Sequence, residues 1–252
     1  MARITEGMAV IPKTASHHEV SYEGLAELGS HTEGTESYTP ILHQEFAYNL
    51  HKIGSQMLEQ KGFTLNGAQY VVSKDGARMF MAQVFDHPDR DDIRLTMAGR
   101  NSTDKSMIAA AALGAQVAIC TNGMISGAIR VMRKHTGDAQ QYLRDHLVLA
   151  FFNATEEWHN LQIDVEEFKA KNFSDRDAYE SMGELWGNRI IPNTHLNPIK
   201  KLWKESALFP ERNLWSFYNC CTELMKGLPP QRTMDQHLRL HSWARDRVGR
   251  KF

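Results

Sequence analysis

A polar turn in the middle of the chain has residue types that bind anions. It consists of Asn101, Ser102 and Thr103. It lies ahead of the alanine-rich segment 106–113, which can form a short buried helix, and such a helix start leaves backbone amides free. Arg100 and Lys105 add positive charge on either side. The pattern predicts an anion-binding turn, although an ordinary helix cap uses the same residues more often.

Two stretches of basic residues can follow a nucleic-acid backbone. The first contains Arg130, Arg133 and Lys134, on a segment that fits a strand or a helix equally well. The second is the C-terminal tail, which includes Arg245 and Arg247. Lysine and arginine side chains neutralise phosphates, so both stretches are candidate nucleic-acid contacts. A solvated charged face, or a terminal helix that pairs with a second subunit, explains the same patterns.

Other residue groups do not combine into a site for catalysis, a metal or a cofactor. Glu156 and His159 have the spacing found in carboxylate-bridged metal bundles, but such bundles need a second copy that the chain lacks. Cys120 precedes an Asn-Gly turn with no His nearby in sequence, which favours a buried core thiol. The segment 101–105 has no P-loop or dinucleotide glycine spacing. We therefore expect no catalytic residue, no metal and no cofactor.

Composition and charge restrict the class of protein. The chain has 252 residues, 42% hydrophobic and 23% charged, which is typical of a globular protein. The formal net charge of -1 excludes a bulk electrostatic attraction to nucleic acid, so any basic surface must be local. The three Cys residues form no disulfide framework. Without a signal-like N-terminus or an apolar run of roughly 20 residues, we expect a cytoplasmic protein with no membrane contact.

The first half of the chain predicts a helix followed by an antiparallel sheet. Thr39 and Pro40 fit an N-cap and a first helical turn, and helical spacing continues to Lys61. β-forming residues separated by turn signals then predict three strands, at 63–72, 78–85 and 93–97. Beyond the alanine-rich segment, a further strand is expected at 115–120, and 124–132 remains open between strand and helix.

The second half predicts mostly helices. A long helix opens at Asp138, Ser174 caps another, and 199–207 and 213–225 are helical. The fold class is therefore α+β, a helix then an antiparallel β-meander packed by helices, with a mainly helical C-terminal half. The predicted divisions are a polar N-terminal arm at 1–39, an α+β core domain at 40–225, and a basic C-terminal helix or tail at 226–252.

Three segments carry a resemblance to a known family. Segments 100–106 and 120–124 are similar to a signature of approximately Asn-Ser-His-Asp-Gly-Ser and then Cys-Ser/Thr-Asn-Gly, and 213–223 is similar to an aromatic pattern. Together they resemble the phage/plasmid-like protein family catalogued as domain of unknown function 932. The chain departs from the signature at Thr103, where His is usual, and at Lys105, where Gly is usual. The resemblance implies a phage or mobile-element origin and supplies no established activity.

These features predict a phage-encoded, non-enzymatic protein that binds single-stranded nucleic acid, with annealing or recombination by an oligomer as its role. The element order is also similar in outline to phage single-strand annealing proteins of the Red-beta and RecT type. The expected phosphate contacts are Arg100, Lys105, Arg130, Arg133 and Lys134, with Arg245 and Arg247 on the tail. An exposed aromatic residue would stack bases, and the candidates are Tyr70, Phe80 and Tyr218.

Two other function classes fit the same sequence. A phage factor that binds and inhibits a host defence protein or a host enzyme agrees with the near-neutral charge and the polar arm. An enzyme that acts on a small phosphorylated substrate would use the 101–105 turn, but no acid–base pair or nucleophile accompanies it.

Overall fold

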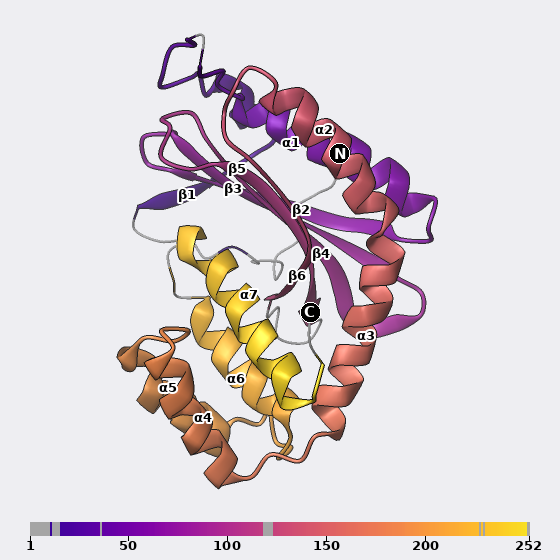
Figure 1. The fold of residues 1–252 in the computed structure, drawn as a ribbon, viewed down its shortest axis with the longest axis vertical. Helices are drawn as coiled ribbons and strands as arrows, with labels where there is room; N and C mark the ends of the chain where they lie inside the picture. Colours follow the sequence, from indigo (N-terminus) through magenta and orange to yellow (C-terminus); the bar gives the residue numbers. More distant parts are fainter. Residues whose placement is uncertain are drawn as a thin grey trace.

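The computed structural model describes residues 11, 16–35, 37–117, 123–226, 228 and 230–250, and of 117, 123–130, 230, 231 and 234 it describes only the backbone. The described chain forms an antiparallel sheet whose six strands lie in chain order (Figure 1). The strands are β1 (His17–Val20), β2 (Thr64–Ser73), β3 (Arg78–His87), β4 (Arg90–Ser102), β5 (Ala109–Val117) and β6 (Gly123–Arg133). The predicted meander is confirmed and is larger than the predicted three strands.

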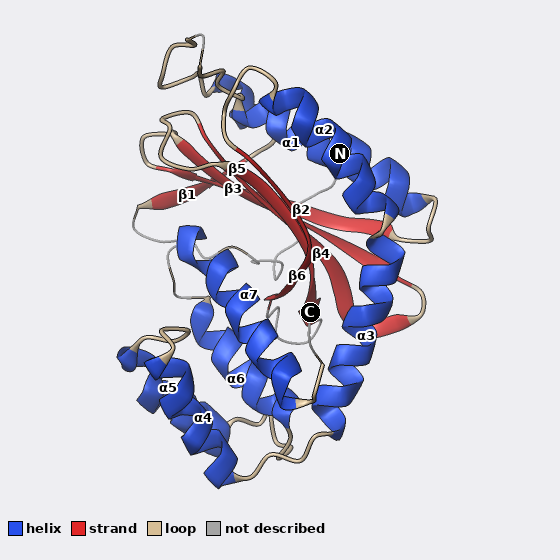
Figure 2. Cartoon of the chain, viewed as in Figure 1, coloured by secondary structure: helices blue, strands red, loops and turns tan. Residues whose placement is uncertain are grey.

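Helices cover both faces of the sheet and fill the second half of the chain, as predicted (Figure 2). They are α1 (His43–Glu59), α2 (Ala139–Phe152), α3 (Ala154–Ala170), α4 (Asp175–Gly187), α5 (Leu196–Glu205), α6 (Leu214–Met225) and α7 (Pro230–Arg247). α1 and α2 lie side by side over one face, α7 lies on the other, α6 packs between α7 and α5, and α4 packs against α5. The described helices include none that is both long and apolar enough to cross a membrane.

The alanine-rich segment forms a strand, so the predicted helix at 106–113 is wrong. β5 pairs with β4 and β6, and Ala111 lies opposite Val131 of β6. Ala111 also lines a small void with Phe151 of α2, whereas the next residue, Ala112, packs against Leu238 of α7. Small side chains let helices approach both faces of this strand. Tertiary packing therefore overrides the local helix propensity of alanine.

The N-terminal region also differs from the prediction. His17–Val20, expected in a polar arm, pairs with the edge of β2 as β1. The predicted helix start at Thr39 is wrong, because α1 begins at His43. The preceding backbone instead crosses to the loop after β6, where Thr39 N donates to His135 O at 3.2 Å and Ile41 N donates to His135 Nδ1 at 3.4 Å. These contacts fix the chain in an extended path before the helix.

The helices of the second half mostly follow the sequence signals. The predicted long helix from Asp138 is interrupted at Asn153, which ends α2 and precedes α3. Asparagine favours such junctions because its side chain competes with the helical backbone. Ser174 caps α4 as predicted, since Ser174 Oγ accepts from Asp177 N at 3.2 Å. Close contact between α1 and α2 also requires Gly54, where a Cβ would lie 2.8 Å from Phe151 Cζ.

Candidate functional site

The turn between β4 and β5 carries the predicted anion-binding residues, but it does not start a helix. Asn101 and Ser102 are the last residues of β4, and the turn covers 103–108. Lys105 has a φ of 65°, the left-handed conformation that costs a side-chain-bearing residue energy. The prediction of a helix cap is therefore wrong, because the chain continues into a strand.

Hydrogen bonds within the turn use the groups that the sequence offered to an anion. Ser102 Oγ accepts from Met107 N and donates to Met107 O, both at 3.0 Å. Thr103 N donates to Ala77 O at 2.9 Å, and Ser106 N donates to Asp104 Oδ1 at 2.9 Å. The turn is thus closed by contacts within it and with Ala77, and the amides of 103, 106 and 107 do not point to a free anion site.

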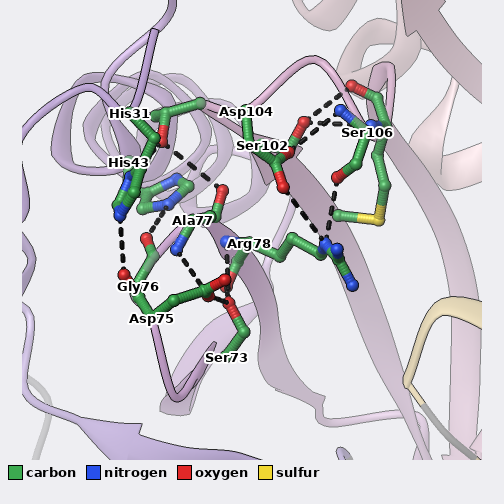
Figure 3. Close-up of polar contacts among 12 residues, drawn as sticks. His31, His43, Ser73, Asp75, Gly76, Ala77, Arg78, Ser102, Asp104 and Ser106 are labelled. Atoms are coloured by element: carbon green, nitrogen blue, oxygen red, sulfur yellow. Dashed lines mark hydrogen bonds and ion pairs between the residues drawn. The ribbon is translucent and has the colours of Figure 1, made fainter.

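Two histidines far away in sequence hold this turn (Figure 3). His43 Nδ1 accepts from Asn101 Nδ2 at 3.1 Å, and its Nε2 donates to Gly76 O at 2.9 Å. His31 Nδ1 accepts from the Thr103 hydroxyl at 2.9 Å, and its Nε2 donates to Asp75 O at 2.6 Å. Burial lowers the pKa of His43 to about 4, so it is neutral and fits this pattern.

Sequence analysis missed both histidines, because their partners lie 58 and 72 residues along the chain. No local spacing indicates such contacts. Arg78 completes the network from β3, since its Nε lies 3.0 Å from Ser106 Oγ and 3.5 Å from Asp104 Oδ2 (Figure 3). The turn is therefore a rigid support.

An open hollow of about 410 Å³ lies beside this turn. We call it the cationic hollow, and it is lined by Ser37, Tyr38, Lys105, Ser106, Met107, Ile108, Lys134, His135 and Thr136. The two lysines, both exposed, were predicted as phosphate contacts on separate segments, and the fold brings them to one place. The lining contains no carboxylate, and neither lysine forms an ion pair in the described part of the chain.

The wall of the cationic hollow is tied to the turn network. The Tyr38 and His135 rings pack with centroids 5.6 Å apart, and Lys105 Nζ lies 4.5 Å from the centroid of Tyr38. Ile41 bridges the two regions, because Ile41 N donates to His135 Nδ1 and Ile41 O accepts from Asn101 Nδ2 at 2.8 Å. Asn101 therefore positions the hollow without lining it.

The other predicted cations of the sheet contact other protein groups or have side chains outside the described residues. Arg133 forms two bonds of 2.6 Å with the carboxylate of Asp138, and its guanidinium lies 4.5 Å from the Tyr142 centroid. Arg100 lies under α7, is 12% exposed, and approaches Asp235 at 3.9 Å. The side chain of Arg130 lies outside the described residues, as do Cys120 and the Asn-Gly turn at 122.

The predicted cations of the tail are parts of ion pairs on α7. Arg245 is 8% exposed, and its Nε lies 3.4 Å from Asp164 Oδ1 on α3. Arg247 pairs with Glu184 of α4, and its guanidinium stands over the Trp243 ring. These contacts attach α7 to the rest of the fold.

Asp164 is the centre of a buried charge cluster that sequence analysis missed. Asp164 is 1% exposed, and Arg250 Nη1 and His241 Nε2 lie 3.0 Å and 3.1 Å from its carboxylate oxygens. With Arg245 they form what we call the Asp164 cluster. The signal in the sequence was weak, because a single aspartate in a helix gives no sign of partners 77 residues away.

The predicted base-stacking residues are all buried. Tyr70 and Phe80 are 5% and 4% exposed within the sheet, and Tyr218 of α6 has no exposed surface. The prediction that one of them is an exposed platform is therefore wrong, because aromatic side chains here fill the core. Among the described residues, no group of three His, Cys, Asp or Glu side chains could hold a metal ion.

Comparison with protein-family models gives a match. A family described as Domain of unknown function (DUF932) matches residues 31–243. No curated protein and no solved structure matches the chain. The match covers the turn, the cationic hollow and most of α7. Because it spans most of the chain, the protein belongs to the DUF932 family.

Proposed function

We propose that the protein is a non-enzymatic factor that binds single-stranded nucleic acid at the cationic hollow. The convergence of Lys105 and Lys134 carries this proposal, because two exposed ammonium groups without a described carboxylate partner attract phosphates. On a chain with a net charge of -1, such attraction must be local. The cationic hollow supplies this local positive charge.

The apolar part of the hollow favours a single strand over a duplex. Met107 and Ile108 are half-buried and line the hollow beside the lysines. Proteins that bind single strands combine a cationic path for the backbone with apolar or aromatic surfaces for unstacked bases. A duplex keeps its bases stacked inside, so it gains nothing from this wall.

A titration with a labelled single-stranded oligonucleotide at several salt concentrations tests the proposal. Two neutralised phosphates give a slope of about −1.4 in a plot of log affinity against log salt, because each contributes about −0.7 on a single strand. Lys134→Gln should weaken binding and bring the slope to about −0.7. The matched control is Lys201→Gln, an exposed lysine on α5 outside the hollow. Absence of binding at low salt, or equal effects of both variants, would contradict the proposal.

Annealing by an oligomer is the role that we propose for this binding, in a protein of phage or mobile-element origin. The hollow is open and offers few contacts, so one copy binds one short stretch of strand weakly, and several copies on one strand increase the affinity. Mixing complementary labelled strands with and without protein measures annealing, and sedimentation with and without oligonucleotide measures assembly. Unchanged annealing rates and a monomer under both conditions would contradict this role.

A second candidate function is binding of a host protein, and an exposed apolar surface on α2 favours it. Val148, Leu149 and Phe152 are 47%, 58% and 67% exposed on neighbouring turns. Large apolar residues grouped on a surface are typical of protein contacts. The test is affinity capture from host lysate after nuclease treatment. One protein recovered by the native chain, and lost with Leu149→Ser together with Phe152→Ser, would support this function; equal recovery would contradict it.

A further inference from the structure

Two buried polar atoms in the wall of the cationic hollow lack hydrogen bonds. His135 is 5% exposed, and its Nε2 has no hydrogen-bond partner among the described residues. Tyr38 is 7% exposed, and its hydroxyl is likewise unpartnered there. Leaving a buried polar group unpaired costs about 1–3 kcal/mol, so such atoms require an explanation. Both residues line the hollow, so a ligand bound there is a candidate partner for these atoms.

The unpartnered atoms are hydrogen-bond donors. Because Ile41 N donates to His135 Nδ1, the neutral ring carries its proton on Nε2. Burial lowers the pKa of His135, and the Thr39 backbone partly offsets this effect. Burial raises the pKa of Tyr38, and the Lys105 backbone partly offsets this effect, so the hydroxyl keeps a proton that it can donate. The wall therefore presents an imidazole N–H and a phenolic O–H that await an acceptor.

Four of the polar residues that line this space favour the same ligand chemistry. Lys105 and Lys134 supply positive charge, His135 and Tyr38 supply neutral donors, and no carboxylate is in the lining. A ligand with several acceptor oxygens and a negative charge satisfies them all, since charge-assisted hydrogen bonds are the stronger kind. Four donors around one space suit a tetrahedral anion better than the two oxygens of a carboxylate.

We propose that the cationic hollow binds a phosphoryl group, with His135 Nε2–H and the Tyr38 hydroxyl donating to its oxygens between the ammonium groups of Lys105 and Lys134. The inference rests on the proposed function, because it assigns atoms in the same hollow. The group has two possible sources, a phosphate of a nucleic-acid strand or free phosphate. Lys105, whose ammonium group stands over the Tyr38 ring, would turn towards the ligand.

Imidazole ¹⁵N NMR of the full chain during titration with inorganic phosphate is the direct test. We expect a saturable shift of the His135 Nε2 resonance. His43 is the internal control, because both of its ring nitrogens already have partners. Lys134→Gln should weaken phosphate binding about tenfold, and Lys201→Gln should leave it unchanged. Absence of a His135 shift would overturn the inference.

Tyr38→Phe is the variant that separates binding from folding. It removes the unpartnered hydroxyl and keeps the ring that packs against His135 and Lys105. A hydroxyl that serves the ligand can be removed without loss of stability, whereas phosphate affinity should fall about fivefold. A variant that melts at the native temperature and binds phosphate with native affinity would count against the inference.

Oligonucleotides with and without a 5′-phosphate distinguish the sources and separate the two proposals. Stronger binding of the phosphorylated strand, with competition by inorganic phosphate, assigns the site to a terminal phosphate. Equal binding of both strands, again with competition, assigns it to internal phosphodiesters. If phosphate shifts His135 but neither strand binds, the phosphoryl site stands and the proposed function fails. If strands bind but phosphate neither shifts the His135 resonance nor competes, the proposed function stands and the phosphoryl site fails.

Discussion

The cationic hollow and the Asp164 cluster contain the same residue types in opposite situations. In the hollow, Lys105 and Lys134 are exposed and have no described carboxylate partner. In the cluster, the side chains of Arg245 and Arg250 are 10% and 20% exposed and converge on Asp164. Buried charge must be paired because removal from water is costly, whereas exposed charge can stay unpaired and meet a ligand. The burial of the charged groups, and not their number, therefore distinguishes the structural Asp164 cluster from the candidate binding site.

The comparison also explains why α7 is no free basic tail. Its last turns attach to α3 through the Asp164 cluster and to α4 through Arg247 and Glu184. Near its start, Asp235 is 61% exposed and reaches Arg100 at 3.9 Å. A basic run in sequence can thus be a structural attachment, while two isolated lysines form the candidate site.

Removing the central carboxylate should have the largest effect on stability. Asp164→Asn leaves Arg245 and Arg250 without a buried counter-charge, and we expect a loss of about 3–5 kcal/mol in the free energy of unfolding. Urea denaturation measures it. Asp235→Asn is the matched control, because the Asp235 side chain is 61% exposed and lies 3.9 Å from Arg100, so this contact contributes at most about 1 kcal/mol. Equal losses of stability in both variants would show that burial does not determine how much these charge pairs contribute.

Acid should have the second-largest effect on stability, because it acts on His43, which holds the turn beside the cationic hollow. The pKa of His43 is about 4 when folded and near 6.5 when unfolded, so the unfolded chain binds more protons between these values. Stability from this group is complete above about pH 6.5, falls by about 3 kcal/mol towards pH 4, and is constant below. Denaturation curves at several pH values test this. In His43→Gln, the fall between pH 6.5 and 4 should be smaller; an unchanged fall would contradict the assignment.

Asn101→Ala should disturb the hollow without touching the Asp164 cluster. The variant removes the donor to Ile41 O and His43 Nδ1, which are buried, and we expect a loss of about 2 kcal/mol in stability. Phosphate affinity should fall as well, because Ile41 holds His135. The contrast with Asp164→Asn is the test: folded Asp164→Asn should bind phosphate with native affinity, and folded Asn101→Ala should not.

Lys105→Gly should have the smallest effect on stability and still reduce binding. Glycine adopts the φ of 65° freely, which offsets the loss of the cation–π contact with Tyr38 and the added flexibility of the unfolded chain. We expect the free energy of unfolding to stay within about 0.5 kcal/mol of the native value. Phosphate affinity should fall about fivefold. A large loss of stability with unchanged binding would make Lys105 a structural residue.

The sequence was sufficient to predict the helices, strands and caps whose signals lie within a few residues. The strands around 63–97, the Ser174 cap and the α6 segment were all predicted, because period, turn residues and caps act within a few positions. The family resemblance was also readable from short motifs, and the match to residues 31–243 confirms the family.

Contacts between distant segments decided the rest. Ala109–Val117 became a strand because β4 and β6 pair with it, a context that overrides alanine's preference for helices. Lys105 and Lys134 met because the β4–β5 turn and the end of β6 lie side by side. The buried, unpartnered donors of Tyr38 and His135 exist only in the fold. The sequence by itself determined which residue types stand together locally. Packing decided which charged side chains stay exposed, because the burial of each depends on neighbours far along the chain.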